Sequence, residues 1–144
     1  MNNVIRFAEW GGEDGLEKFI LAQTGCKPFT GAGINYRKTK KTTILKSVDN
    51  TYYYDDKLDD SDNVEYTLFG HNGDQSETEA MFNEPLLNLA KTEHIYLYRV
   101  SPLKRGQVYL WYGKYEIVGQ TTRPHQGKDY KMRNIIVLCL RRLD

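Results

Sequence analysis

The chain has 144 residues, the usual size of one domain, and we expect residues 1–144 to form a single domain. Its 40% hydrophobic and 27% charged residues are ordinary for a globular protein, no apolar run approaches the roughly 20 residues of a membrane span, and the N-terminus lacks a signal-peptide pattern. The net charge is only +1. Cys26 and Cys139 form no Cys-x-x-Cys pair, so we expect two buried free thiols, with one disulfide as the alternative, and a location in the cytoplasm, with the bacterial nucleoid or the nucleus as variants.

The segment EDGLEKFILAQTG predicts a short helix near the N-terminus. Asp14 is the expected cap, with Glu17 three residues later, and Gly25 is the expected stop. The apolar face of this helix would consist of Leu16, Phe19 and Ile20. A loop containing Pro28 is expected to follow and to continue through the basic stretch YRKTKK.

The middle of the chain predicts two strands and a second helix. The strands are TTILK and VEYTLF, and the loop GHNGDQ follows the second of them. The helix is expected to begin at Asn83, with Pro85 in its first turn, where the missing N–H does no harm.

The last third predicts four strands, HIYLYRV, QVYLWY, YEIVG and NIIVLCL. Gly113-Lys114 fits a two-residue hairpin turn between the second and third, and TTRPHQGKDYKMR is expected to be a basic loop before the last. Two short helices and six or seven strands predict an α+β fold, in which the helices flank a curved, barrel-like mixed β-sheet.

The most unusual stretch is YYYDDKLDDSDNVEYT, residues 52–67. Seven acidic residues occur from Asp49 to Glu65, and the stretch sets four tyrosines, residues 52–54 and Tyr66, among and directly after them. A solvated or disordered loop has no need of several rings, whereas a pocket for a flat polar ligand uses both rings and carboxylates. The alternative is that the tyrosines make ordinary cross-strand packing.

Basic residues gather on both sides of this acidic stretch. Residues 37–46 contain five and no acid, and residues 104–142 contain nine against two acids. A near-neutral total can therefore hide a basic surface typical of polyanion binding, and a mixed solvated surface is the alternative.

The sequence lacks the common signatures of catalysis. The three histidines, His71, His94 and His125, have no metal-ligand spacing, and there is no phosphate loop, dinucleotide fingerprint or nucleophile elbow. Asp59 and Asp60 are more typical of a solvated acidic turn than of a metal site. We therefore expect a binding module rather than an enzyme, with no metal and no cofactor.

The order of several short motifs resembles the SRA family, the SET-and-RING-associated domains, which recognise modified cytosine in DNA by flipping the base out. From about Gly15 to Asp144 these motifs are TGCKPFTGAGINYRK, YYDD, EYTLFGHNGDQ, FNEPLL, WYGKYEIV and IIVLCLRRLD. The resemblance implies a PUA-like fold and, as partner, double-stranded DNA that contains 5-methylcytosine or 5-hydroxymethylcytosine.

The chain departs from the family pattern at three places. Leu68 replaces a glycine, Glu84 replaces an arginine, and the loop from Leu68 to Asp74 is far shorter than the DNA-contacting finger of eukaryotic members. The short form is similar to bacterial SRA-like domains attached to modification-dependent restriction nucleases.

The resemblance implies a pocket for the flipped base. Tyr53 and Tyr66 would sandwich the base, the Asp56 carboxylate would accept from the cytosine amine, and the Thr67 hydroxyl would line the wall. Stacking on two rings replaces the lost duplex stacking at roughly 1–3 kcal/mol per base. A carboxylate also repels the carbonyl that thymine presents in place of the amine.

One register remains open, because neighbouring strand residues face opposite sides. Shifted by one residue, Tyr54 and Asp55 would take the roles given to Tyr53 and Asp56. The expected DNA contacts are Arg37, Lys38, Lys40 and Lys41 on one loop, His71 and Asn72 on a second, and Lys128, Lys131 and Arg133 on a third.

The sequence thus predicts the target-recognition module of a bacterial modification-dependent restriction system, associated with the nucleoid, whose nuclease is a separate domain or subunit. A PUA-like or B3-like domain that binds a DNA sequence or RNA without base flipping is the alternative. An enzyme acting on the base is a third hypothesis, which the missing catalytic motifs disfavour.

Overall fold

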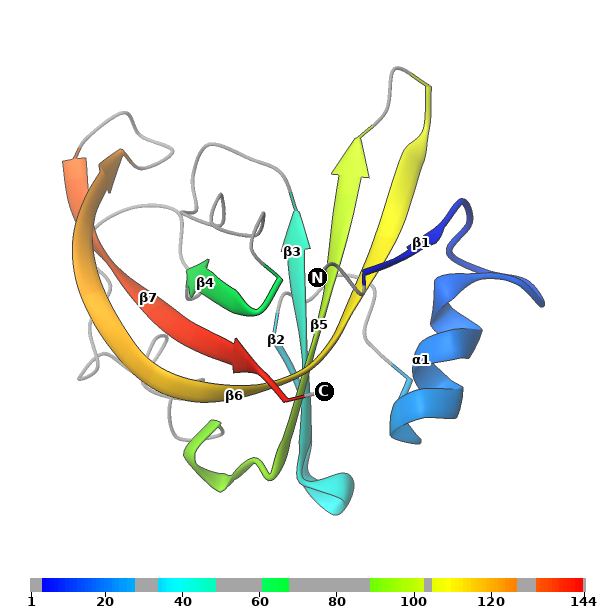
Figure 1. Cartoon of the computed structure of the whole chain (residues 1–144), viewed down its shortest axis with the longest axis horizontal. Coiled ribbons are helices and arrows are strands. Elements are labelled where there is room, and N and C mark those ends of the chain that lie inside the picture. Colours follow the sequence, from blue (N-terminus) through cyan, green and yellow to red (C-terminus); the bar gives the residue numbers. More distant parts are fainter. Residues whose placement is uncertain are drawn as a thin grey trace.

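The fold is given by a computed structural model, which describes residues 4–27, 34–48, 61–67, 89–102, 105–126 and 132–143. One helix and seven strands are defined in these ranges (Figure 1). In chain order they are β1 (Ile5–Phe7), α1 (Leu16–Thr24), β2 (Ile34–Arg37), the 3-10 turn η1 (Lys38–Lys40), β3 (Thr42–Val48), β4 (Asn63–Thr67), β5 (His94–Pro102), β6 (Gln107–Gln126) and β7 (Met132–Arg142).

The seven strands form one mixed sheet in the order β2-β3-β5-β6-β7-β4, with β1 paired to β6 beside this path. The neighbours β3 and β5 are parallel, and the other pairs are antiparallel. The long strand β6 bends strongly, and β7 follows its curve (Figure 1). The mixed, mostly-sheet fold is confirmed, but no ladder joins the end strands β2 and β4 in the described part, so closure into a barrel is not.

The hairpin turn predicted at Gly113-Lys114 is wrong, because β6 runs through both residues. Gly113 has a φ of 104°, and the pairing with β5 shifts register beside it, since Leu97 pairs with Gly113 but Tyr98 with Trp111. A positive-φ glycine suits a bulge as well as a turn, and a bulge bends and twists a strand without ending it. The expected loop after it also belongs to β6 as far as Gln126.

Helix α1 is confirmed, and so is its end at Gly25, which has a φ of 71° and donates its N–H to the Leu21 carbonyl. The predicted cap at Asp14 is wrong: Gly15 is the N-cap, and no side chain caps the helix. Backbone carbonyls take the place of that cap, because the preceding turn folds back over the helix start.

That turn requires a glycine at its end. The N–H groups of Leu16 and Glu17 donate to the carbonyls of Glu9 and Trp10, at 3.0 and 2.9 Å. A Cβ on Gly15 would lie 2.4 Å from the Trp10 carbonyl oxygen, so any side chain there would displace the turn.

Two further predictions concern the loop after α1 and the second helix. The expected loop before residue 42 instead contains strand β2, which pairs Tyr36 and Arg37 of the basic stretch with β3, and the 3-10 turn η1. The second helix, expected from Asn83, lies outside the described residues except at its end, where residues 89–91 have helical backbone.

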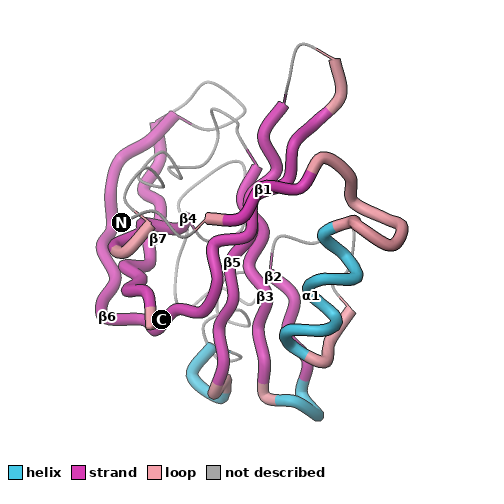
Figure 2. Tube along the Cα trace, turned by 45° about the vertical axis from the view of Figure 1, so that its right-hand side comes forward, coloured by secondary structure: helices cyan, strands magenta, loops and turns pink. Residues whose placement is uncertain are grey.

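Side chains pack on both faces of the sheet, because successive strand residues point to opposite sides. The outer core, on the face that α1 covers, consists of Leu16, Ile20, Cys26, Ile44, Tyr98, Val100 and Trp111. The inner core, on the concave face, consists of Leu45, Val64, Tyr66, Leu89, Ile95, Leu97, Tyr112, Tyr115, Ile136, Leu138 and Leu140. Figure 2 shows α1 beside β2 and β3, with β4 on the other side of the sheet.

Candidate functional site

Strand β4 carries the two pocket residues that the structure describes. Tyr66 points into the inner core and is only 3% exposed, and its hydroxyl donates to the Lys46 carbonyl of β3 at 2.9 Å. Thr67 ends the strand, with its backbone opposite Val137 of β7, and its side chain is not among those described. The Tyr66 side chain therefore spans the concave side of the sheet from β4 to β3.

The beginning of β4 is held in the same manner. The buried Tyr115 hydroxyl donates to the Ser61 carbonyl at 2.5 Å, and the Arg142 N–H donates to the Asp62 carbonyl at 2.9 Å. Two tyrosine hydroxyls and the β7 ladder thus fix β4 between its neighbours. The other predicted pocket residues, Tyr53 and Asp56, and the alternative pair Tyr54 and Asp55, lie outside the described residues.

The first predicted DNA-contact segment forms the turn between β2 and β3. Lys40 and Lys41 are exposed, whereas Arg37 is half-buried and its guanidinium donates to the Lys27 carbonyl. Lys38 lies in η1, but its side chain is not described. Two exposed ammonium groups on one short turn can meet adjacent phosphates.

This turn has a fixed backbone. Lys41 has a φ of 48°, and among the described residues it alone combines a positive φ with a side chain. Its carbonyl accepts the N–H groups of Glu93 and His94 at 2.8 and 3.1 Å. The Lys41 ammonium lies 3.6 Å from the Glu93 carboxylate, but both groups are more than half exposed, so the pair stabilises little.

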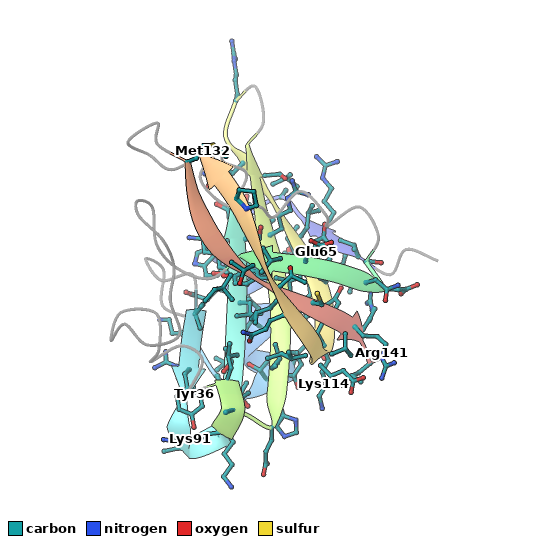
Figure 3. The ribbon with its side chains drawn as sticks, turned by 90° about the vertical axis from the view of Figure 1, so that its left-hand side faces the viewer. Tyr36, Glu65, Lys91, Lys114, Met132 and Arg141 are labelled. Atoms are coloured by element: carbon teal, nitrogen blue, oxygen red, sulfur yellow. The ribbon has the colours of Figure 1, made fainter. Side chains whose placement is uncertain are left out.

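The basic segments lie at opposite ends of the molecule. Figure 3 places Tyr36 and Lys91, beside the Lys38–Lys41 turn, at one end and Met132 at the other. Arg133 follows Met132 on β7, with its backbone opposite His125 and its side chain not described. Four predicted contacts lie outside the described residues: His71, Asn72, Lys128 and Lys131.

A groove that the sequence did not indicate lies beside β1 and the turn between β5 and β6. It has a volume of about 450 Å³, and its lining includes Arg6, Trp10, Arg105 and Tyr109. Its sequence signal is weak, because the three residues of β1 are too few to show a strand period. Arg105-Gly106 between two strand patterns is a turn signal, but nothing in it indicates a ligand.

The described ranges contain neither a candidate metal site nor a candidate membrane-spanning helix. No group of three or more His, Cys, Asp or Glu side chains there could hold a metal ion. No helix in this part of the chain has the length and apolar character to cross a bilayer. Cys26 and Cys139 are free thiols.

Burial, with a smaller contribution from the Glu17 carboxylate, raises the pKa of Tyr98 above its usual range.

The comparison with protein families settles the fold family. The profile of the ScoMcrA-like SRA domain matches residues 20–144. This chain belongs to that SRA domain family. The family predicted from the sequence motifs is therefore confirmed. The match begins at Ile20, so β1 and Trp10 lie before the part of this SRA domain that the profile covers.

Solved structures with the same fold come from larger proteins. KRYPTONITE in complex with mCHH DNA, an H3(1-15) peptide and SAH has a TM-score of 0.62 at 19% identity, covering 100% of this chain and 32% of that one. The DNA modification-dependent restriction endonuclease AspBHI has a TM-score of 0.61 at 13% identity, covering 96% and 41%.

The sulfur-binding and SRA domains of ScoMcrA, complexed with phosphorothioated DNA, have a TM-score of 0.55 at 22% identity, covering 95% and 39%. This SRA domain thus spans well under half the length of each of the three. At these identities the likeness shows the fold. Among curated proteins, none matches the sequence significantly.

Proposed function

We propose that this SRA domain recognises modified cytosine in double-stranded DNA by base flipping, as the target-recognition part of a bacterial modification-dependent restriction system. The family match over residues 20–144 carries this proposal. It is supported by structural neighbours whose descriptions name mCHH DNA, phosphorothioated DNA and modification-dependent restriction. Cleavage of DNA is assigned to a separate domain or subunit, and this domain acts in the cytoplasm at the nucleoid.

Tyr66 is the proposed fixed wall of the base pocket. Its hydroxyl is bonded to the Lys46 carbonyl, so the plane of the ring is set before DNA arrives. Because Tyr66 is only 3% exposed, a flipped base would have to displace the groups that cover one face of the ring. A stacking surface that loses no freedom on binding retains more of its 1–3 kcal/mol per base. Tyr53 is proposed to cover the opposite face of the base, and Thr67 to line the side.

Asp56 is the proposed acceptor for the cytosine amine. An ionised carboxylate accepts from that amine and repels the carbonyl that thymine or uracil presents there. One methyl group contributes only about 1 kcal/mol by burial, so the modified 5-position adds a modest preference to this base selection.

Lys40 and Lys41 are proposed to hold phosphates of the duplex. Both are exposed on a turn that the Lys41 carbonyl bonds to the start of β5. Phosphate contacts carry no base information, so they should contribute equally to modified and unmodified DNA and weaken as salt rises. Lys128, Lys131 and Arg133 are proposed as a second set of phosphate contacts, and His71 and Asn72 as further DNA contacts.

A barrel-like closure of the sheet is part of the same proposal. The Tyr66 hydroxyl already bonds β4, at one end of the strand order, to β3, near the other end. A pocket for an extruded base would lie between these two strands.

The test is a titration of matched duplexes with and without one 5-methylcytosine. Asp56→Ala should lose about ten- to a hundred-fold of the affinity for the modified duplex, because a hydrogen bond to a charged group is worth about 1.5–3 kcal/mol. Its residual binding should equal that of the unmodified duplex, since the lysines remain.

Asp55→Ala is the register control and should leave the preference for the modified duplex intact. A preference lost in Asp55→Ala alone would move the pocket by one residue. If both variants prefer the modified duplex as wild type does, base flipping at this site is refuted. A wild type without any preference would support the PUA-like or B3-like alternative.

A further inference from the structure

The groove beside β1 has the size of a small-ligand site. Its volume of about 450 Å³ lies in the range of roughly 300–1,000 Å³ that small molecules and nucleotides occupy. It is bounded by β1, by residues 8–10 that follow it and by residues 105–109 at the start of β6. In Figure 1 this region lies beyond β5 and β6, on the side of the sheet away from β4.

One wall of the groove consists of the aromatic rings of Trp10 and Tyr109, and neighbouring groups hold Trp10 in place. The Trp10 ring centroid lies 5.4 Å from that of Tyr98 and 5.7 Å from that of Tyr109. The Trp10 indole N–H donates to Glu17 Oε2 at 3.2 Å, and the Trp10 carbonyl accepts the Glu17 N–H at 2.9 Å. Helix α1 therefore holds this tryptophan through both its side chain and its backbone.

The polar groups of the groove are arranged around that wall. Arg6 and Arg105 are both exposed, one from β1 and one from the turn before β6. The Tyr109 hydroxyl donates to Gln107 Oε1 at 3.1 Å, which orients the amide so that its nitrogen can still donate to a ligand. Glu9 contributes one carboxylate.

We propose that this groove binds a nucleotide of a single-stranded nucleic acid, with the base against Trp10 and Tyr109 and the phosphate on Arg6 and Arg105. Aromatic walls beside positive charge are the general means by which single strands are held without sequence preference. Glu9 favours a nucleotide over an acidic peptide, because its carboxylate can accept from the exocyclic amine of a base, whereas an acidic side chain offers no such donor.

This site is distinct from the proposed base pocket. It lies across the sheet from β4, and its β1 side precedes residue 20, where the family profile begins. A strand without cytosine cannot be recognised through Asp56, so the two sites can be tested separately.

The experiment measures fluorescence anisotropy of a labelled oligodeoxyadenylate hexamer with the intact domain at low salt. The Arg6→Ala/Arg105→Ala double variant should weaken binding about tenfold or more, because each phosphate contact contributes to a salt-dependent affinity. The matched control is Lys18→Ala/Arg141→Ala. It removes two positive side chains that do not line the groove and are 55% and 62% exposed, and it should change the affinity less than threefold.

Equal hexamer binding by wild type and the groove variant would overturn the proposal, and so would equal losses in both double variants. A polyglutamate peptide that binds more tightly than the hexamer, with the same dependence on Arg6 and Arg105, would overturn it in favour of an acidic peptide. The groove variant should keep its preference for a duplex with 5-methylcytosine, so a failure here leaves the proposed function untouched.

Discussion

The two faces of the sheet are stabilised by different kinds of contact. On the outer face, one continuous segment, residues 4–27, supplies α1 and the rings of Phe7, Trp10 and Phe19, which pack on β5 and β6. On the inner face the described part contributes only a short helical end, residues 89–91, through Leu89. Strands distant in sequence meet there directly, and tyrosine hydroxyls bond to backbone carbonyls far away in sequence: Tyr66 to Lys46 of β3, and Tyr115 to Ser61 in the turn before β4.

The outer face therefore acts as the scaffold, and the inner face carries the candidate site. The outer core is apolar and aromatic, and its stability follows from buried area. The inner core is apolar as well, but two hydrogen bonds in it also fix where β4 lies, and β4 is the strand that carries Tyr66 and Thr67. Changes in the outer core should therefore alter stability alone, whereas removal of single hydroxyls inside should lower stability by a smaller amount and also alter the position of the site.

The largest expected effect concerns the outer core. Ile20 is fully buried, and Ile20→Ala should lower the free energy of unfolding by about 2–5 kcal/mol through lost burial and a cavity. Leu21→Ala on the same helix is the control, because Leu21 is 48% exposed. Apart from the change in helix propensity, this substitution should lower the free energy of unfolding by about 0.5 kcal/mol or less. Urea unfolding measures both, and equal losses would mean that α1 does not dock as described.

A smaller effect is expected on the inner face. Tyr115→Phe should cost about 1–3 kcal/mol, because the buried Ser61 carbonyl loses a donor. Tyr109→Phe removes an exposed hydroxyl bonded to Gln107, so it should cost no more than about 0.5 kcal/mol. Thermal unfolding compares the two variants. If the exposed hydroxyl mattered as much as the buried one, the directional bonds would not distinguish the inner core.

The smallest effect is a dependence on alkaline pH that arises in the outer core. Burial raises the pKa of Tyr98 above the 10.0 of a free phenol. Above pH 10 the unfolded chain loses this proton while the folded chain keeps it, so the stability is complete below pH 10 and declines as the pH rises further. Tyr98→Phe should make the decline shallower by up to about 1.4 kcal/mol per pH unit. Parallel urea titrations at pH 9 and 11 would refute this if wild type and variant lost equal stability.

The sequence predicted those features that depend on neighbouring residues. Leu16 and Ile20 are buried together and Gly25 ends the helix, because a helical period and a glycine stop are local properties. The Asp14 cap failed because carbonyls of a preceding turn satisfy the same N–H groups, and no period reveals such a turn. The hairpin turn predicted at Gly113 was wrong because a glycine with a positive φ occurs in bulges as well as in hairpin turns.

The candidate site was predicted in part. Tyr66 and the basic turn at Lys40 and Lys41 were named from sequence, and the structure shows how Tyr66 and that turn are held. The distance between the two basic segments could not be foreseen, because it depends on the unbroken length of β6. Tyr53 and Asp56 stay predictions. The groove at Trp10 could not be foreseen, because it needs residues 6–10 and 105–109, two segments far apart in sequence, to be brought together.

The parallel pairing of β3 with β5 has a consequence for how the chain folds. Residues 49–93 connect these neighbours, and β4 lies within that connection although it pairs with β7, the last strand. Among the described strands β4 pairs only with β7, so during synthesis this pairing waits until residues 132–142 have left the ribosome, whereas α1 and β3 are complete much earlier. Since long-range pairing is slow, we expect the strand with the candidate pocket to assemble last, which makes the closing steps of folding also the steps that create the site.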